Sequence, residues 1–440
     1  MVIKLVSINR YLLNIGVVIT DRLAMMIFQL WLSSYLVNRL GIDGFGLWSL
    51  VFNSLSIIGA VCILSLDAIV VKDVVNHKDM ANKYINNAFF IQLVGFLVLV
   101  LIATFLYKDD SVLVCMSAAS ILVGNFFIIL TRPITWIYSA EVDSKYRSVS
   151  VLFSFGLFLL IYLLGSKNIS DYAVCVYGLF YFVQFLIMYT VYLFFYKKKL
   201  FHFRFNLLVS SFSKSYVRIG SALIISTLSV MIFTQSDVLM IAYFIDNQAV
   251  GQYSAGVKIS TSIFMLAGIL ANTFYPKFLV LPERIRVVFL SFSLRLLLIA
   301  TVIGSAIIYF LSNSIISIIY HHDDVIINVL KMHIWCSLFI FTGAFTSKYL
   351  YVKNFYKIEV IKTLVAAIIN VALNILFIPF FGVLGAVYSS FVSFFMANFI
   401  LFYFFSSTKI VFAVHLSSFF GLLDIKKMKR EIGVLRCYFR

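Results

Sequence analysis

Charged side chains interrupt several of the long apolar runs of this chain. Asp21 and Arg22 lie in the middle of the first run, and Asp237 and Lys258 lie in two consecutive runs of the second half. A charged side chain near the centre of a lipid bilayer costs at least about 2.5 kcal/mol on insertion scales, so it is retained there where it pairs, faces water or binds a ligand. If these runs cross a membrane, their charges are the first candidates for chemistry.

Arg22 and Asp21 are neighbours in sequence but cannot pair with each other on a helix. Adjacent helical residues project about 100° apart, so each needs its own partner. Arg22 is a candidate to bind an anionic group in a cavity, and Asp21 is a candidate for proton exchange. The competing interpretation is that both make ion pairs with other helices.

Asp237 and Lys258 are predicted to lie at the same depth. At 1.5 Å per residue, each is about 10 Å from the outer end of its helix. Equal depth on consecutive antiparallel helices predicts an ion pair, which would be structural or would break during a transport cycle. Nearby, Gln235 is a candidate to hydrogen-bond a polar ligand, although hydrogen bonds between helices explain such residues equally well.

Three further charges lie within apolar runs. Asp67 and Arg132 are each close to the cytoplasmic ends of their runs, where a long side chain can reach water at lower cost. They are candidates for gating at the inner mouth of a cavity. Arg295 belongs to the ninth run, which we expect to lie away from a central cavity. We therefore expect Arg295 to serve topology or lipid contact.

The composition predicts an all-α integral membrane protein. The 440 residues are 62% hydrophobic and 12% charged, whereas soluble domains carry roughly a quarter charged residues. Runs of about 20 apolar residues, the length needed to cross a bilayer, recur along the chain. Twelve transmembrane helices are expected at about 11–37, 46–70, 86–106, 112–137, 149–165, 172–195, 217–243, 252–276, 287–310, 326–347, 360–380 and 385–406.

The distribution of Lys and Arg predicts the orientation. Most of the 35 basic residues fall in the termini and in alternate loops, and the other side carries only Arg39, Lys108, Lys167 and Lys331. By the positive-inside rule both termini are cytoplasmic. The net charge of +17 is then a topology signal, and no nucleic-acid partner is expected.

The basic residues also suggest how the chain is divided. We expect an N-terminal six-helix bundle at 1–196, a basic cytoplasmic linker at 197–216, a second six-helix bundle at 217–406 and a basic cytoplasmic tail at 407–440. The linker and the tail could lie against anionic headgroups. Gly, one residue, an aromatic residue and Ser begin both the second and the eighth run, which predicts a repeat of the two bundles about a cavity.

No sequence pattern points to an enzyme or a cofactor. The chain lacks a Gly-x-x-x-x-Gly-Lys-Ser/Thr phosphate loop, a dinucleotide fingerprint and a His-Glu-x-x-His metal pair. Its five Cys show no paired spacing, so no metal site is expected. A membrane glycosyltransferase or polymerase would need a large outer loop, but the longest outer stretch, around His321–Asp324, is short.

Three segments carry a family resemblance. Gln235 to Met240 followed by Val250 to Ile259 resembles the seventh-to-eighth helix signature of the polysaccharide transporter family, within the multidrug, oligosaccharidyl-lipid and polysaccharide exporter superfamily. Leu40 to Trp48 and Asn370 to Ala386 are also similar to that family. Together with the twelve runs, the resemblance covers essentially the whole chain.

The resemblance implies a function that the composition alone does not predict. Bacterial O-antigen flippases of this family move undecaprenyl-diphosphate-linked oligosaccharide units across the inner membrane. It implies alternating access, an H⁺ or Na⁺ gradient as driving force, and a polysaccharide polymerase and a chain-length regulator as partners beside membrane lipids. The alternative is a cation-coupled multidrug exporter of the same superfamily. The cavity arginines of flippase relatives are sparse here, with Arg22 the clearest, and this departure weakens the argument for an anionic substrate.

Overall fold

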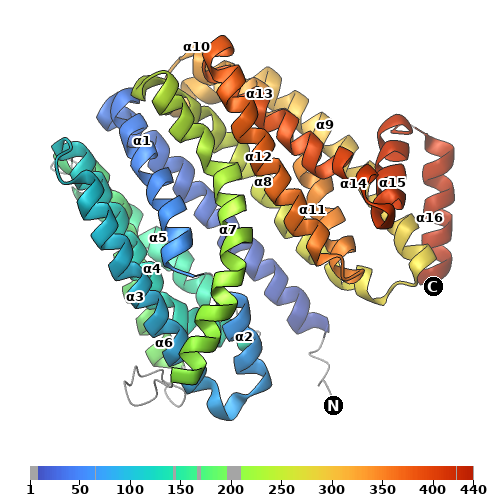
Figure 1. Ribbon diagram of the computed structural model, residues 1–440, viewed down its shortest axis with the longest axis horizontal. Helices are drawn as coiled ribbons and strands as arrows, with labels where there is room; N and C mark the ends of the chain where they lie inside the picture. Colours follow the sequence, from blue (N-terminus) through green and yellow to red (C-terminus); the bar gives the residue numbers. More distant parts are fainter. Residues whose placement is uncertain are drawn as a thin grey trace. The chain divides into compact units, whose positions relative to one another are not determined.

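The computed structural model describes residues 8–64, 66–141, 145–165, 170–195, 210–422 and 424–439, and all regular secondary structure in these ranges is helical. The chain forms two compact units, Met1–Met231 and Ile232–Arg440 (Figure 1). The helices of the first unit are α1 Ile8–Cys62, α2 Asp67–Asn76, α3 Ala81–Tyr107, α4 Val112–Ala140, α5 Lys145–Gly165 and α6 Val176–Phe195. Helix α7, Ser210–Phe244, contains the boundary, and the second unit continues with α8 Asn247–Val280, α9 Glu283–Tyr320, α10 Asp324–His333, α11 Ser337–Val352, α12 Tyr356–Phe381, α13 Val383–Phe395, α14 Leu401–Phe404, α15 Lys409–Phe420 and α16 Ile425–Phe439.

The expectation of about twelve membrane helices is confirmed. Ten stretches of the described chain are long and apolar enough to cross a bilayer. One of them, Arg22–Cys62, holds two expected spans, because Gly41 with φ of +73° joins two helices within α1. At 1.5 Å per residue these 41 residues cover about 60 Å, twice the hydrocarbon thickness. Helix α5 supplies the remaining span with 21 residues.

Aromatic side chains hold the first unit together. Helix α1 packs against α5 and α4, and α4 packs against α6. Between α1, α5 and α6 the rings of Phe28, Phe158 and Phe180 are nearly completely buried. Phe28 stacks on Phe180 at 15° between planes, and Phe158 meets both rings edge-on. This cluster fixes the face that α1 turns toward its neighbours.

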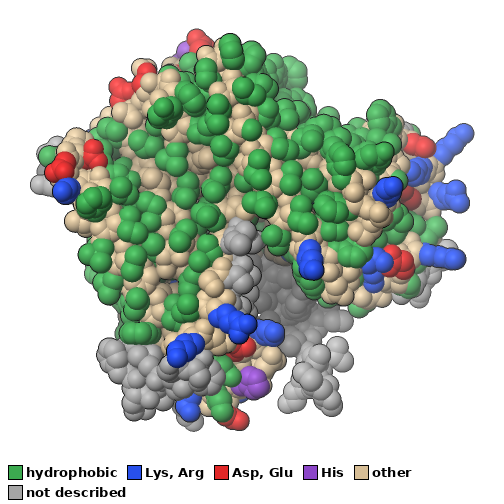
Figure 2. Space-filling view, in the orientation of Figure 1, with side chains coloured by type: hydrophobic (Ala, Val, Ile, Leu, Met, Phe, Trp, Pro, Cys, Tyr) green, Lys and Arg blue, Asp and Glu red, His purple; other side chains and the backbone are tan. Residues whose placement is uncertain are grey.

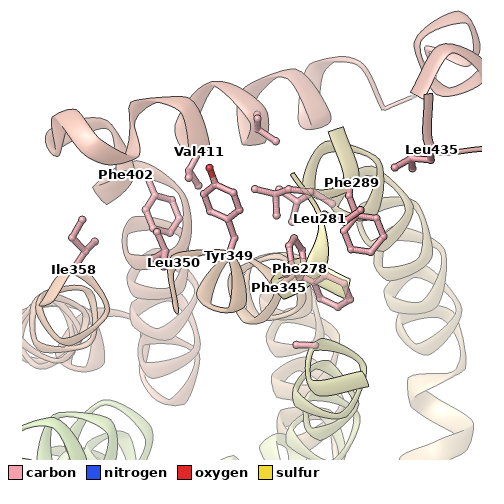
Figure 3. Packing of buried hydrophobic residues seen from close by; sticks show 14 residues of the cluster. Phe278, Leu281, Phe289, Phe345, Tyr349, Leu350, Ile358, Phe402, Val411 and Leu435 are labelled. Atoms are coloured by element: carbon pink, nitrogen blue, oxygen red, sulfur yellow. The ribbon is translucent and has the colours of Figure 1, made fainter. Parts of the chain in front are cut away.

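A large apolar cluster in the second unit includes the tail of the chain. Phe278, Phe289 and Tyr349 come from α8, α9 and α11, and they pack with Val411 of α15 and Leu435 of α16 (Figure 3). Both tail helices contact α9. The segment 407–440 therefore contains two helices packed on the second unit.

The environment of Arg295 corrects an expectation. Its guanidinium is fully buried, and Nη1 lies 3.3 Å from Oε2 of Glu431 on α16. The hydroxyl of Ser291 donates to the other oxygen of Glu431 at 2.8 Å. Arg295 is thus exposed to neither lipid nor solvent, and the expected lipid contact was wrong. Its positive charge compensates the carboxylate of Glu431, which lies on the tail helix α16, 136 positions later in the sequence.

The opposite face of α16 is basic. Lys426, Lys429 and Arg430 are exposed, while Glu431 is buried. Figure 2 shows blue side chains gathered over α15 and α16, whereas hydrophobic side chains cover the faces of the long helices. Helix α16 is therefore amphipathic, with Leu435 and the paired Glu431 on its buried side.

We predict that Arg295→Ala strongly destabilises the second unit, by about 3–5 kcal/mol, because it leaves the Glu431 carboxylate buried without a counter-charge. The double variant Arg295→Met with Glu431→Leu should regain most of that loss. Thermal unfolding of the purified chain in detergent micelles measures both effects.

Arg284→Ala is the matched control, since Arg284 is an exposed arginine of the same helix. Equal unfolding temperatures for Arg295→Ala, Arg284→Ala and the unmodified chain would show that the buried pair contributes nothing.

Candidate functional site

A buried carboxylate lies where four helices of the second unit converge. Asp237 of α7 is 3% exposed. Its Oδ2 accepts hydrogen bonds from the hydroxyl of Tyr253 on α8 and, at 2.7 Å, from Ser390 on α13. Its Oδ1 accepts a hydrogen bond from Nδ2 of Asn374 on α12 at 2.6 Å. The described partners of this carboxylate are all neutral groups, each from a different helix.

A second layer of amide and hydroxyl groups surrounds these contacts. Oδ1 of Asn370 accepts from Ser236 at 3.0 Å and from Asn374 at 3.2 Å, and Nδ2 of Asn370 donates to Ser390 at 3.4 Å. Oδ1 of Asn374 is buried and makes no hydrogen bond within the described part of the chain. The network therefore holds Asp237 firmly and leaves one amide oxygen for a further donor or a cation.

Local sequence explains how α12 and α13 reach the carboxylate. Asn370 and Asn374 are four residues apart, so both project from the buried face of α12. Gly382, with φ of +59°, ends α12 and reverses the chain into α13. At Gly385 a Cβ atom would lie 2.3 Å from the carbonyl oxygen of Phe377, so only glycine allows α13 to approach α12 this closely. Ser390 is thereby brought beside the two asparagines.

The predicted ion pair between Asp237 and Lys258 is not formed in this structure. The depth estimate places Lys258 at a suitable level, but it ignores the direction of the side chain. Tyr253 points at Asp237, and Lys258 follows it by five residues, which rotates it about 140° around α8. Lys258 is half-buried on another face of that helix. Gln235, also half-buried, precedes Asp237 by two residues and does not share its face.

In the first unit, two gating candidates are brought together. Nη1 of Arg132 on α4 lies 3.7 Å from Asp67 at the start of α2, and Nε1 of Trp136 donates to the same carboxylate at 2.6 Å. Their proximity was not predicted, and their role in gating stays a prediction. Arg22 is exposed on α1, and the side chain of Asp21 lies outside the described residues.

A further contact in the first unit joins α7 to α2. The hydroxyl of Tyr216, before the membrane-spanning part of α7, donates to Asp73 at 3.0 Å. Burial raises the pKa of Tyr216, and the negative charge of Asp73 raises it further. The phenol therefore stays protonated and keeps donating to Asp73 throughout the physiological range.

The Asp237 network fits a proton or a monovalent cation better than a transition metal. Carboxylate, amide and hydroxyl oxygens are hard ligands, which suit hard cations. Over the described ranges, no group of three or more His, Cys, Asp and Glu side chains is placed to hold a metal ion. Two groups could neutralise Asp237: a bound proton, or a cation that also contacts Oδ1 of Asn374.

Comparison with known proteins identifies the family. Residues 11–280 match the family described as polysaccharide biosynthesis protein, which is more than half of the chain. The chain belongs to this family. It is also 24% identical over 289 residues to the uncharacterized membrane protein EpsK of Bacillus subtilis (strain 168), a match that covers 61% of this chain and 56% of that relative.

Solved structures share the fold of this polysaccharide biosynthesis protein. The lipid II flippase MurJ, in an inward closed conformation, superimposes with a TM-score of 0.67 and 14% identity over 94% of this chain and 92% of that one. An inward-facing multidrug resistance MATE family transporter of the MOP superfamily gives 0.65 and 14% over 92% and 96%. At this identity the likeness concerns the fold, which is common to flippases and multidrug transporters.

We predict that Tyr253→Phe and Asn374→Ala each destabilise the second unit by about 1–3 kcal/mol, since each removes a donor from a buried carboxylate. In an Asp237→Asn background the cost of Tyr253→Phe should shrink, because the remaining amide carries no charge. Thermal unfolding in detergent of the four single and double variants gives the coupling.

Tyr243→Phe is the control, because Tyr243 lies near the end of α7, the helix that carries Asp237, but is 83% exposed. Additive costs for Asp237→Asn and Tyr253→Phe would contradict a direct contact between the two side chains.

Proposed function

We propose that the protein is a flippase of the bacterial inner membrane that moves undecaprenyl-diphosphate-linked oligosaccharide units, for O-antigen or a related polysaccharide, to the periplasmic leaflet. The family match over residues 11–280 carries the proposal. The twelve-helix fold, shared with a lipid II flippase, supports it. A polysaccharide polymerase and a chain-length regulator are the partners we propose, since each flipped unit must then be joined to others.

We propose alternating access as the transport mechanism. The sugar-diphosphate head would cross through a hydrophilic cavity while the polyprenyl tail stays in lipid. Arg22 of α1 is our candidate for the diphosphate, because it is exposed within a membrane helix and a guanidinium binds phosphate oxygens bidentately.

We propose that the Asp237 network binds the coupling ion, H⁺ or Na⁺. A carboxylate held by neutral donors carries a full negative charge that a proton or a cation can neutralise. The unpartnered Oδ1 of Asn374 supplies a further ligand for a cation. By contrast, an ion pair of the Arg295 and Glu431 kind is already neutral and has no such capacity.

The second candidate function is cation-coupled export of drugs. The likeness to multidrug MATE transporters, with a TM-score of 0.65, favours it as strongly as fold alone can. The family match favours the polysaccharide substrate, because it rests on the sequence of this chain.

Deletion of the gene is predicted to trap lipid-linked repeat units on the cytoplasmic leaflet while their synthesis continues. Analysis of extracted lipids and of surface polysaccharide measures this. Normal surface polysaccharide in a clean deletion strain, with no second flippase in the genome, would contradict the flippase proposal and leave drug export as the candidate function.

Rescue of that strain tests Arg22. Arg22→Ala should abolish export, and Arg22→Lys should retain part of it, because lysine keeps the charge but loses the bidentate geometry. Arg284→Ala, at an exposed arginine in the first turn of α9, should export normally. Membrane levels of each variant are measured in parallel. Full export by Arg22→Ala would return Arg22 to a structural role.

Rescue with Asp237→Asn tests the coupling. The isosteric amide preserves the shape of the network but cannot be neutralised, so export should fall at least tenfold. Its residual export should no longer respond to collapse of the proton or sodium gradient, whereas export by the unmodified protein should respond to one of the two. Asp109→Asn, at an exposed acid of the first unit, is the control. Gradient-dependent export by Asp237→Asn at the normal level would refute the assignment.

A further inference from the structure

One face of α1 carries aromatic, amide and cationic side chains around a hollow of about 360 Å³, lined by Trp31, Ser34, Tyr35, Asn38 and Arg39. Their spacing of three or four residues places them on a single face of the helix. From Trp31 to Arg39 the helix rises by about 12 Å, a length that suits a short oligosaccharide. Gly41 then breaks the helix just beyond it.

The aromatic part of this face is rigid. The rings of Trp31 and Tyr35 are almost parallel, at 6° and 5.4 Å between centroids. Trp31 also meets the buried ring of Phe158 edge-on at 5.4 Å. Trp31 itself is half-buried, so the packing behind it fixes its orientation and part of the ring remains accessible. Such a prepared platform binds a flat apolar surface at low entropic cost.

The polar part lies at the far end of the same face. The guanidinium of Arg39 is 5.9 Å from the ring centroid of Tyr35, and Nδ2 of Asn38 lies 3.4 Å from the hydroxyl of Ser34. Asn38 and Arg39 are exposed, and Arg39 forms no ion pair with a described acid. Arg39 is also among the few basic residues on the predicted outer side. Its charge is thus available to a ligand.

We propose that this face of α1 is a binding site for a sugar ring that carries a neighbouring anionic group. A pyranose presents an apolar C–H face, which fits the accessible part of the Trp31 ring, backed by the buried ring of Tyr35, and a rim of hydroxyls, which fits Asn38 and Ser34. The anionic group, from the diphosphate linker or from an acidic sugar, lies at Arg39. Aromatic residues at a membrane interface are common, but that pattern does not require an exposed amide and an exposed arginine on the same helical face.

The proposal deepens the proposed function, on which it rests for the origin of the sugar, and binding can be measured independently of transport. The full chain is labelled with 5-fluorotryptophan and placed in nanodiscs, and its four Trp give ¹⁹F signals. Trp31→Phe assigns the Trp31 signal. The probes are farnesyl-diphosphate-linked N-acetylglucosamine, farnesyl diphosphate, and a tetrasaccharide of alternating glucuronic acid and N-acetylglucosamine.

Trp335 is the internal control. It lies 6.5 Å from Tyr309, over which the ammonium of Lys331 sits at 5.6 Å, so the second unit has an aromatic pair with a cation as well. We expect the sugar-bearing probes to shift the Trp31 signal and leave the Trp335 signal in place. No shift at Trp31 with either sugar probe, or an equal shift with farnesyl diphosphate alone, would overturn the proposal.

Two substitutions of exposed residues, which leave the platform intact, test the polar contacts. Asn38→Leu should lower the affinity for both sugar-bearing probes about tenfold. Arg39→Gln should lower the affinity for the lipid-linked probe alone if its partner is the diphosphate, and for the acidic tetrasaccharide alone if its partner is a sugar acid. Lys331→Gln should change neither affinity. Unchanged binding of both probes to both variants would refute the site.

Export by the same variants separates the two proposals. In the rescued deletion strain, Asn38→Leu and Arg39→Gln should lower surface polysaccharide about tenfold at normal protein levels. If deletion traps lipid-linked units but these variants export normally, the binding site falls and the flippase proposal stands. If deletion has no effect on polysaccharide, the flippase proposal falls, and the fluorine signals alone decide whether the face binds sugars.

Discussion

The burial of one carboxylate constrains the arrangement of the second unit. Removing a charge from water without compensation costs far more than the net stability of a protein, so Asp237 requires donors wherever it lies. Here they come from α8, α12 and α13. These helices can converge on α7 only because Gly382 reverses the chain and Gly385 lets α13 approach α12. The need to bring hydrogen-bond donors to this carboxylate thus explains the glycines at positions 382 and 385, far from Asp237 in the sequence.

The second unit contains a second buried carboxylate, with a different solution. Glu431 is compensated by the full charge of Arg295, whereas the described contacts of Asp237 are hydrogen bonds from neutral groups. An ion pair in an apolar cluster is neutral as a whole, although the buried nitrogens of Arg295 make no hydrogen bond within the described part of the chain. A carboxylate among neutral donors retains a net charge, which a proton or a cation can remove and restore. The first arrangement secures the tail helix, and the second can respond to its surroundings.

Sequence reasoning predicted the helices better than their contacts. Hydropathy located the twelve spans because a lipid-facing helix must be apolar along its whole length, whatever it packs against. It also singled out Asp237, since a mid-span acid is costly in any bundle. The predicted ion pair with Lys258 rested on depth without direction: Lys258 follows Tyr253 by five residues, which rotates it about 140° around α8, and the pair is not formed in this structure. Arg295 could not be paired from sequence, because its acid lies in a tail that hydropathy does not place. Asn370 and Asn374 were visible as a family motif, yet only the fold shows which carboxylate they serve.

The proposed ion site and the proposed substrate residues belong to different units of the chain. An ion at Asp237 can shift a conformational equilibrium only by binding one state more tightly than the other. Its network draws on four helices, so a state that separates any one of them weakens the site and favours release. Helix α7 carries Asp237 in the second unit and continues without interruption into the first, where Tyr216 bonds Asp73. The residues proposed to meet the substrate, Arg22 and the face from Trp31 to Arg39, belong to the first unit. Helix α7 is thus the described segment that carries the proposed ion site in the second unit and continues in sequence into the unit with the proposed substrate residues.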